Sequence, residues 1–223
     1  MTERKDATGK KLEAKITGKQ EIVGGFLRLN RIFIEKGRHE GGKENITWTV
    51  MERGHAVGVL AYDPKRDEVV LVNEMRPGIL CAGDYPYTDN LIAGGIGKNE
   101  TAIEAGVRET MEEAGLELKD PVLVHPGAYV SSGGTSEKIA IVAGIVDTSK
   151  AGGIHGNADE RENIKSTVLS ADEFFRQVRS GEMNDLKTLV AGYWLMENRP
   201  ALQLKYNAAP KAAPKSASRD FKR

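Results

Sequence analysis

Residues 94–116 read GGIGKNETAIEAGVRETMEEAGL, and the expected fold is built around this stretch. Thr101 followed three residues later by Glu104 has the spacing of a capping box, which predicts that a helix begins there. Gly115 stands where a C-terminal cap glycine ends a helix. Between these limits, apolar or near-apolar side chains recur at helical spacing and predict one buried stripe, made of Ile103, Val107, Thr110, Met111 and Ala114.

The face opposite this stripe concentrates carboxylates. Glu109 shares a face with both Glu112 and Glu113, because residues three and four apart are neighbours on a helix. Like charges at this spacing cost about 0.2–0.5 kcal/mol per pair on an exposed helix. A bound divalent cation reverses that repulsion, and Mg²⁺ takes one or two carboxylates while leaving positions for water and phosphate. The charges alone also fit a solvated acidic face, so the flanking residues must decide between a metal site and a surface helix.

The flanking residues resemble the Nudix hydrolase box, G-x5-E-x7-R-E-U-x-E-E-x-G-U, in which U is a bulky aliphatic residue. Eight of the nine specified positions match, from Gly94 and Glu100 through the run Arg108–Leu116. The exception is Thr110, whose β-branched side chain is similar in size to valine, so we expect it to affect packing rather than chemistry. We expect Glu100 and Arg108 to form a structural ion pair. The resemblance implies a metal-dependent hydrolase of a phosphorylated small molecule.

Composition excludes several other classes of protein. The chain has 223 residues, with 32 Lys plus Arg and 32 Asp plus Glu, so no global charge points to nucleic acid or an anionic membrane. The one cysteine, Cys81, excludes an internal disulfide and a cysteine-rich zinc site. The charged N-terminus resembles no signal peptide, and no apolar run approaches the ~20 residues of a membrane span. We therefore expect a cytoplasmic protein with a small-molecule substrate and no nucleic-acid or membrane partner.

The order of the remaining elements predicts an α+β fold, with a mixed β-sheet sandwiched between helices. Apolar alternation and β-prone residues predict strands at 22–35, 46–51, 56–62, 68–75, 91–93, 121–130, 137–146 and 164–169. Residues 1–20 are expected to be frayed at the start, and 78–90 and 147–163 are expected to be loops. Two later helices are predicted at 171–180, capped by Ser170 with Glu173 at the capping-box position, and at 185–197, ending before Pro200.

Three units follow from this pattern. Residues 1–54 form an N-terminal strand or hairpin unit, 55–200 the hydrolase domain, and 201–223 a disordered tail biased in Ala, Pro, Lys and Ser. A lone hairpin is marginal in water and needs another surface to cover it. A second subunit is one such surface, so we expect the hairpin unit to be used in dimerisation.

The resemblance extends beyond the box to one branch of the Nudix family. The stretches RGHAVGVLAYDPKRDEVVLVNEMR (53–76), SSGGTSEK (131–138) and AGGIHGNADERENI (151–164) resemble those of ADP-ribose pyrophosphatases, a branch that includes GDP-mannose pyrophosphatases. This implies a homodimer, with N-terminal strands lying over the partner and the base held between subunits. It also implies hydrolysis of the pyrophosphate bond of ADP-ribose or a related nucleoside diphosphate sugar, yielding a nucleoside monophosphate and a sugar phosphate. The implied cofactor is Mg²⁺, with Mn²⁺ as an alternative.

The resemblance assigns roles to single residues. The metals are held by Glu109, Glu113 and the carbonyl of Ala93, while Glu112 assists or takes a further metal. A glutamate of the later loop activates water: we prefer Glu160 as the base and Glu162 as a metal-side carboxylate. In the same way Arg76 contacts the diphosphate, and Gly133 and Glu137 of the glycine turn face the substrate, the glycine also serving the turn. Trp48 stands where it could stack on the base, although a tryptophan in the hairpin core is the alternative.

One departure concerns substrate choice. Nudix ADP-ribose hydrolases usually carry a proline sixteen residues after the box, a position occupied here by Ser132. The remainder of that turn matches the branch, so the departure concerns the identity of the nucleoside or sugar rather than the hydrolysis. GDP-mannose or another nucleotide sugar is therefore an alternative substrate. A Nudix-fold regulator that binds nucleotide without turnover is the alternative from another class.

Overall fold

The computed structural model describes residues 9, 11–157, 159 and 161–207. Its larger unit is a mixed sheet of eight strands, in the order β10-β11-β5-β4-β9-β8, with β6 paired to β5 and β7 paired to β4. The strands are β4 (Ala56–Asp63), β5 (Glu68–Met75), β6 (Tyr87–Asn90), β7 (Ile92–Gly95), β8 (Lys119–Tyr129), β9 (Lys138–Ile145), β10 (Ile154–His155) and β11 (Ile164–Ser170). β4 and β9 run parallel, and the other pairs are antiparallel.

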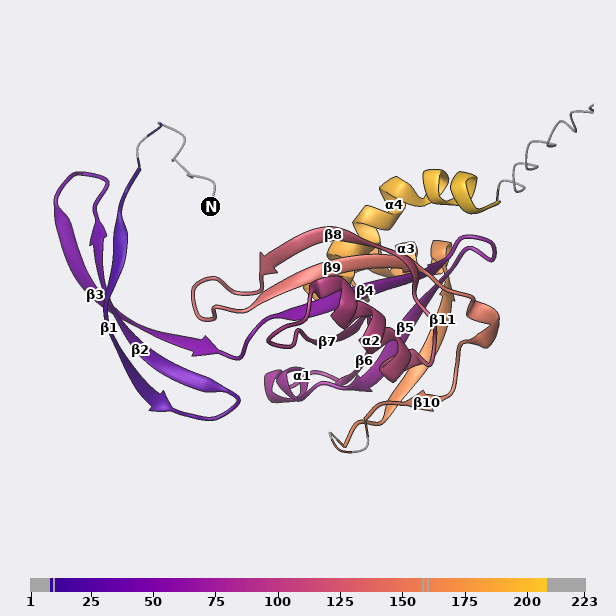
Figure 1. Ribbon diagram of the computed structural model, residues 1–223, viewed down its shortest axis with the longest axis horizontal. Helices are drawn as coiled ribbons and strands as arrows, with labels where there is room; N and C mark the ends of the chain where they lie inside the picture. Colours follow the sequence, from indigo (N-terminus) through magenta and orange to yellow (C-terminus); the bar gives the residue numbers. More distant parts are fainter. Residues whose placement is uncertain (1–8, 10, 158, 160, 208–223) are drawn as a thin grey trace, which may run out of the picture.

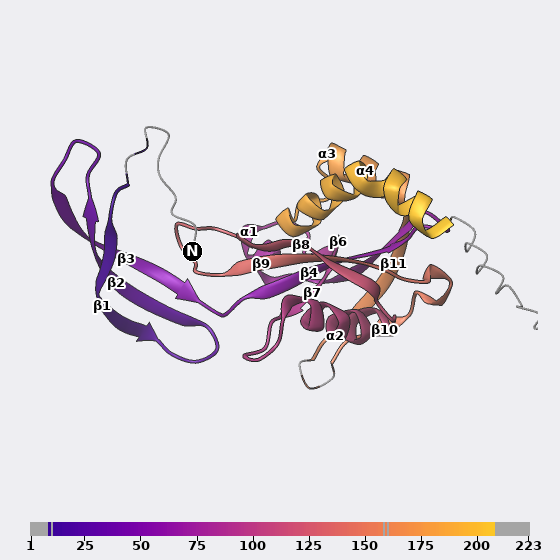
Figure 2. The same cartoon turned by 45° about the horizontal axis from the view of Figure 1, so that its top comes forward.

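Helices cover both faces of this sheet, as the sequence predicts (Figures 1 and 2). α2 (Ala102–Ala114) lies on one face, and α3 (Ala171–Ser180) and α4 (Leu186–Asn207) lie on the other. Alternation along β4 explains the layering: Val57 and Val59 pack in the core under α2, whereas Leu60 and Tyr62 pack in the core under α3 and α4. A strand buried on both faces reads as a continuous apolar run, which is why 56–62 is a clear strand in the sequence.

The N-terminal unit is a separate antiparallel sheet of three strands, in which the second and third strands form the predicted hairpin and the first strand is an addition to it. Its strands are β1 (Ala14–Val23), β2 (Arg28–Gly37) and β3 (Lys43–Glu52). β1 overlaps the segment expected to be frayed. Its side chains are almost all exposed, so no buried alternation marks it, and the ladder with β2 holds it in place.

The N-terminal sheet joins the larger unit at the glycine turn before β9. Met51 N donates to Gly134 O at 2.8 Å, and Ser136 N donates to Met51 O at 3.1 Å. The Trp48 indole Nε1 donates to Gly133 O at 2.6 Å. Apart from this junction, the sheet stands to one side of the molecule (Figure 1).

Three further expectations need correction. The stretch 78–90 is not a loop, because it holds α1 (Pro77–Ala82) and β6; Pro77 begins α1, where its missing N–H is tolerated, and Gly83 ends it with φ 88°. The loop 147–163 contains a short 3-10 helix, Thr148–Lys150, and β10. The last helix continues through Pro200 to Asn207 instead of ending before the proline.

Contacts on both sides of Pro200 explain why α4 continues. A proline inside a helix costs about 3 kcal/mol. Before it, Arg199 Nε donates to Asp67 Oδ1 at 2.9 Å and Arg199 Nη1 to Asp172 Oδ1 at 2.7 Å. After it, Leu202 packs against the core and Tyr206 OH donates to Asp120 Oδ2 at 2.7 Å. The expected disordered tail is thus helical as far as residue 207, and 208–223 lie outside the described residues.

None of the helices within the described ranges combines the length and the apolar character that crossing a membrane requires.

Candidate active site

The helix α2 fixes the positions of the box carboxylates, and its predicted caps are confirmed. Thr101 Oγ1 accepts from Glu104 N at 3.2 Å, and the Glu104 carboxylate accepts from Thr101 N at 2.8 Å. Gly115 ends the helix with φ 65°, in the left-handed region that favours glycine. With both ends fixed, the direction of each side chain on the helix is set.

The buried face of α2 differs from the predicted apolar stripe. Glu109 and Glu113 are 8% and 3% exposed, whereas Val107 and Met111 are 39% and 52% exposed. Gly106 explains the rotation, because an added Cβ there would lie 3.2 Å from Val59 Cγ2, so that the helix backbone approaches β4 closely. This approach directs the two carboxylates against β7, where burying charge would be unfavourable unless something compensates it.

The backbone of β7 packs directly against both buried carboxylates. Ala93 N donates to Glu113 Oε2 at 3.0 Å. At Gly94, an added Cβ would lie only 1.8 Å from Glu109 Oε1, so no residue with a side chain fits there without displacing the carboxylate. The first glycine of the box is therefore explained by close approach, and it places Ala93 beside Glu109 and Glu113.

Arg108 links the carboxylates on the solvent side of the cluster. Its Nε lies 2.9 Å from Glu100 Oε1, and its Nη1 lies 2.7 Å from Glu109 Oε1 and 2.9 Å from Glu112 Oε2. The structural ion pair of Glu100 with Arg108 is thus confirmed. Hydrogen bonding to Glu100 is the largest cause that raises the pKa of Arg108 above its usual value, so its positive charge is secure.

The nearby positive charges do not fully offset the burial of the two carboxyls. Burial raises the pKa of Glu113 to about 8 against the opposing Ala93 N–H, and the neighbouring charges of Glu109 and Glu74 add to the rise. Burial also raises the pKa of Glu109, although Arg108 opposes it. A divalent cation close by would reverse both shifts, since it favours the charged carboxylate.

The donor set fits a hard divalent cation of the Mg²⁺ or Mn²⁺ type. Carboxylate and carbonyl oxygens of Glu109, Glu112, Glu113 and Ala93 are the ligand types that these ions take. Across the part of the chain that the structure describes, no three acidic, histidine or cysteine side chains converge into a complete metal-binding group. Mg²⁺ takes few protein ligands and completes its shell with water and substrate phosphate.

The later loop brings Glu162 toward this cluster. Asn157 N donates to Glu162 Oε2 at 2.8 Å, and Gly156 N donates to Glu112 O at 3.1 Å, so the loop is fastened to α2. The charge of Glu162 is one of the influences that raise the pKa of Glu109. Glu160, preferred as the base, lies outside the described residues.

Arg76 directly follows β5, lies beside a cavity and has unused hydrogen-bonding capacity. Its Nη1 pairs with Glu74, and its Nη2 is buried with no hydrogen-bond partner among the described residues. A buried donor without a partner costs free energy, so it indicates a ligand or solvent group at this place. Glu74 is not singled out by the sequence reasoning, because a single acidic residue at a strand end carries no signal.

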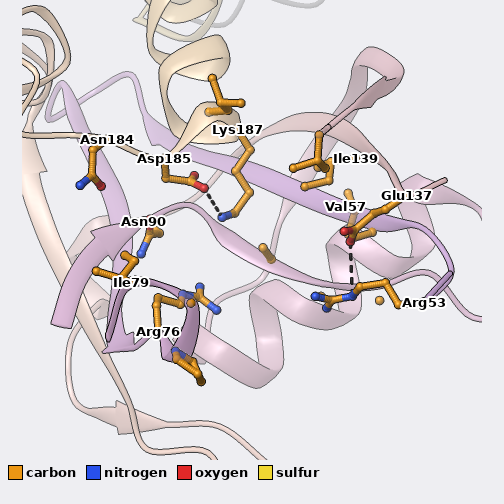
Figure 3. A pocket seen from close by; sticks show the side chains of 18 of the residues that line it. Arg53, Val57, Arg76, Ile79, Asn90, Glu137, Ile139, Asn184, Asp185 and Lys187 are labelled. Carbon is orange, nitrogen blue, oxygen red and sulfur yellow. Dashed lines mark ion pairs between the residues drawn. The ribbon is translucent and has the colours of Figure 1, made fainter. Parts of the chain in front are cut away.

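The cavity has a volume of about 730 Å³ and lies between α1, β7, the start of β9 and the start of α4 (Figure 3). It brings together the predicted Arg76, Ala93 and Glu137, and Arg53 Nε pairs with Glu137 Oε1 at 3.6 Å. Trp48 and Gly133 do not line it; they bind each other at the junction with the N-terminal sheet. Trp48 is 51% exposed, so it is not a buried core residue.

The lining also contains polar residues that the sequence reasoning missed, which are Arg53, Asp84, Asn90, Asn184, Asp185 and Lys187. The last three lie at the start of α4, more than 90 positions after Ala93, and only tertiary folding brings them to the cavity. Nothing in the local sequence distinguishes them from ordinary residues before and within an amphipathic helix.

Comparison with known proteins agrees with this geometry. The family model of the NUDIX domain matches residues 52–186. The ADP-ribose pyrophosphatase of Escherichia coli K12 is 35% identical over 201 residues, which cover 86% of this chain and 92% of that protein. The GDP-mannose pyrophosphatase of E. coli SMS-3-5 is 25% identical over 166 residues, covering 74% of this chain and 85% of that protein.

A solved structure shares the fold. The crystal structure of an ADP compounds hydrolase superposes with a TM-score of 0.62 at 17% identity, covering 88% of this chain and 96% of that one. The domain match spans the strands, the carboxylate helix and the later loop in one continuous segment. The chain therefore belongs to the Nudix family.

Proposed function

We propose that this protein hydrolyses the pyrophosphate bond of ADP-ribose or a related nucleoside diphosphate sugar, releasing a nucleoside monophosphate and a sugar phosphate. The observation that carries the proposal is the pair of buried glutamates, Glu109 and Glu113, held against Ala93 and Gly94 beside a cavity. The 35% identity to ADP-ribose pyrophosphatase over 86% of the chain supports the choice of substrate.

In this proposal, Glu109, Glu113 and the Ala93 carbonyl hold Mg²⁺, or Mn²⁺, and Glu112 assists. The bound cation would neutralise phosphate oxygens and lower the pKa of water. Arg108 keeps Glu109 and Glu112 oriented from the solvent side. The pKa shifts of Glu109 and Glu113 support the assignment, because burial disfavours their charged forms and a cation would favour them.

The remaining roles concern water and substrate. A carboxylate of the loop, Glu160 as base with Glu162 on the metal side, takes the proton of the attacking water. Arg76 donates its unpartnered Nη2 to the diphosphate, because a guanidinium can hold phosphate oxygens with parallel hydrogen bonds. Glu137 lies in the cavity wall, and Gly133 and Trp48 hold the glycine turn beside it, where the indole face is open to a base.

Purified protein with Mg²⁺ or Mn²⁺, assayed on a panel of nucleotide sugars, tests the proposal directly. We expect ADP-ribose to give the highest kcat/KM, with AMP and ribose 5-phosphate as products. Hydrolysis in ¹⁸O-labelled water then identifies the phosphorus that is attacked. A panel in which no nucleoside diphosphate sugar is cleaved would contradict the proposal.

Two alternatives are decided by the same panel. GDP-mannose is the second candidate, favoured by Ser132 in place of the usual proline and by the 25% identity to a GDP-mannose pyrophosphatase. A preference for GDP-mannose over ADP-ribose would select it. A regulator without turnover would bind ADP-ribose tightly and yield no product over hours, but the complete set of Glu109, Glu112 and Glu113 argues against it.

We also propose that the protein is a cytoplasmic homodimer, in which residues up to 54 form the dimerisation unit beside a hydrolase domain of residues 55–200. The N-terminal sheet carries exposed apolar side chains, among them Ile16 at 68% and Phe26 at 81% exposure. Apolar patches of this kind mark interaction surfaces. The exposed thiol of Cys81 suits a reducing compartment.

A further inference from the structure

The two ends of the cavity differ in chemistry. Toward the N-terminal sheet its wall is largely apolar, with Val57, Val130 and Ile139 beside the Arg53–Glu137 ion pair. At the start of α4 the wall carries the polar residues Asn90, Asn184, Asp185 and Lys187, alongside the apolar Ile79 and Leu186. Figure 3 shows Arg76 and the Asp185–Lys187 pair extending into the cavity from different walls. No aromatic ring lines the cavity along the described part of the chain.

Lys187 occupies an unfavourable position for a residue with only a structural role. Its side chain is 12% exposed, although lysine loses much conformational freedom when it is buried. It is the second residue of α4, where the helix dipole disfavours a positive charge. Its stem crosses β4, since an added Cβ at Gly58 would lie 3.3 Å from Lys187 Cδ, and its ammonium reaches the cavity.

Asp185 forms a salt bridge with Lys187 and is itself held in place by hydrogen bonds. Its Oδ1 lies 2.9 Å from Lys187 Nζ, while its Oδ2 accepts from Thr188 N at 3.1 Å and from Thr188 Oγ1 at 2.7 Å. Thr188 Oγ1 in turn accepts from Leu91 N at 3.2 Å. The strand that carries Ala93 begins at the next residue, so the pair is fixed relative to the proposed metal site.

We propose that Lys187 Nζ, together with Asp185 Oδ1 and the Asn184 amide, binds the hydroxyl groups of the terminal sugar of the substrate. This rests on the proposed function and assigns the non-nucleotide end of the nucleoside diphosphate sugar to the α4 end of the cavity. An ammonium has three donors, of which the salt bridge uses one, and a carboxylate oxygen still accepts. Together they match neighbouring hydroxyls, which both donate and accept.

Charge and shape favour a sugar over the other parts of the substrate. Asp185 neutralises Lys187, so the pair offers little net attraction to phosphate, whereas Arg76 has a free buried donor for it. A base would seek a flat aromatic surface, which this end of the cavity lacks. The polar end is therefore suited to the part of the ligand that is neutral and rich in hydroxyls.

The test measures binding rather than turnover. Two non-hydrolysable ligands, α,β-methylene-ADP-ribose and α,β-methylene-ADP, are titrated calorimetrically into the full-length protein with Mg²⁺, and the ratio of their Kd values gives the contribution of the sugar. Lys187→Met removes the ammonium and keeps the length of the stem. We expect the variant to bind the sugar-bearing analogue about tenfold more weakly, as for loss of a hydrogen bond to a charged group. Binding of α,β-methylene-ADP should stay within twofold.

Two more variants keep the result interpretable. The double variant Asp185→Asn with Lys187→Met removes both charges and leaves a side-chain oxygen at position 185 that accepts from Thr188. It replaces the single variant in the titrations if Lys187→Met alone fails to fold. It should lose the same sugar contribution. Lys119→Met, at an exposed lysine of β8 outside the cavity, should behave as wild type.

Outcomes separate this inference from the proposed function. Equal weakening of the binding of both analogues would assign Lys187 to the phosphates and overturn the inference. Unchanged binding of both analogues by a folded variant would also overturn it. So would a wild type that binds the two analogues with the same Kd. A sugar contribution that disappears in Lys187→Met supports it. That result stands even if a parallel assay finds no hydrolysis of ADP-ribose, in which case only the proposed function fails.

Discussion

Glu113 combines burial, a raised pKa and a single backbone hydrogen bond, and this combination makes it the most informative residue to change. Glu113→Gln keeps the shape and the contact with Ala93 N but removes the charge that would bind a cation. We expect kcat/KM for ADP-ribose to fall by about 10²-fold or more, a loss of ~2.7 kcal/mol of transition-state stabilisation. Steady-state assays at several Mg²⁺ concentrations measure it, and turnover equal to wild type would reject the metal assignment.

The matched control is Glu117→Gln, which makes the same chemical change at an exposed residue just after the helix. It should leave kcat/KM within about twofold, as is usual for surface substitutions. Circular dichroism of both variants checks that the fold is intact. A comparable loss in both would mean that overall charge, rather than a bound cation, controls the rate.

At the same scale, the sequence predicts part of the site. Spacing alone identifies Glu109 and Glu113, since a carboxylate cluster with a fixed signature is visible in one segment. The spacing does not show why position 94 must be a glycine. The reason is the contact of Gly94 with Glu109, which depends on how closely β7 approaches α2. Nor does the spacing identify Lys187 and Asn184 as residues of the cavity, because they are distant in the sequence and reach it only through the packing of α4.

At the scale of elements, the burial pattern of a helix or strand decides how well its bounds can be predicted from the sequence. β4 and β5 are buried on both faces and α2 has strong caps, so all three are predicted within a residue or two. β1 is exposed and α4 passes through a proline, so β1 and the continuation of α4 through Pro200 are not predicted, because their stability comes from partners. The buried face of α2 is predicted only in part: Thr110 and Ala114 are buried as expected, but a site can bury charges where packing alone would bury apolar side chains.

The anchoring of α4 by Arg199 gives a prediction at this scale. Burial would raise the pKa of Asp67, but hydrogen bonds from Arg199 and Tyr62 lower it below its usual value of 3.8. A carboxyl with a lowered folded-state pKa contributes stability above its unfolded pKa and loses it as the pH falls through the folded value. Arg199→Met should therefore reduce the free energy of unfolding by about 1–2 kcal/mol at pH 7, and by progressively less below pH 3.8.

Urea unfolding from pH 7 to pH 3 measures this difference, with Arg179→Met as the control at an exposed arginine of α3. The control should show no comparable loss at pH 7. An Arg199→Met effect that is independent of pH would indicate that the guanidinium over the Phe175 ring, 5.4 Å from the ring centroid, stabilises the helix instead of the ion pair.

At the scale of the whole molecule, the proposed homodimer depends on the N-terminal sheet. Within one chain it touches the larger unit mainly at the glycine turn, and none of the helices that the structure describes covers it (Figure 2). Phe26 lies in the β1–β2 connection and is 81% exposed, which is unfavourable for a large aromatic side chain in water.

Light scattering should therefore give a mass of about twice 24.3 kDa for the wild type. Ile16→Asp with Phe26→Asp should shift it toward the monomer, because carboxylates at a packed apolar interface cannot keep their hydration. Leu204→Asp, equally exposed but near the far end of α4, should leave the mass unchanged. A wild type that elutes as a monomer at micromolar concentration would mean that the sheet has another purpose than joining two copies of this chain.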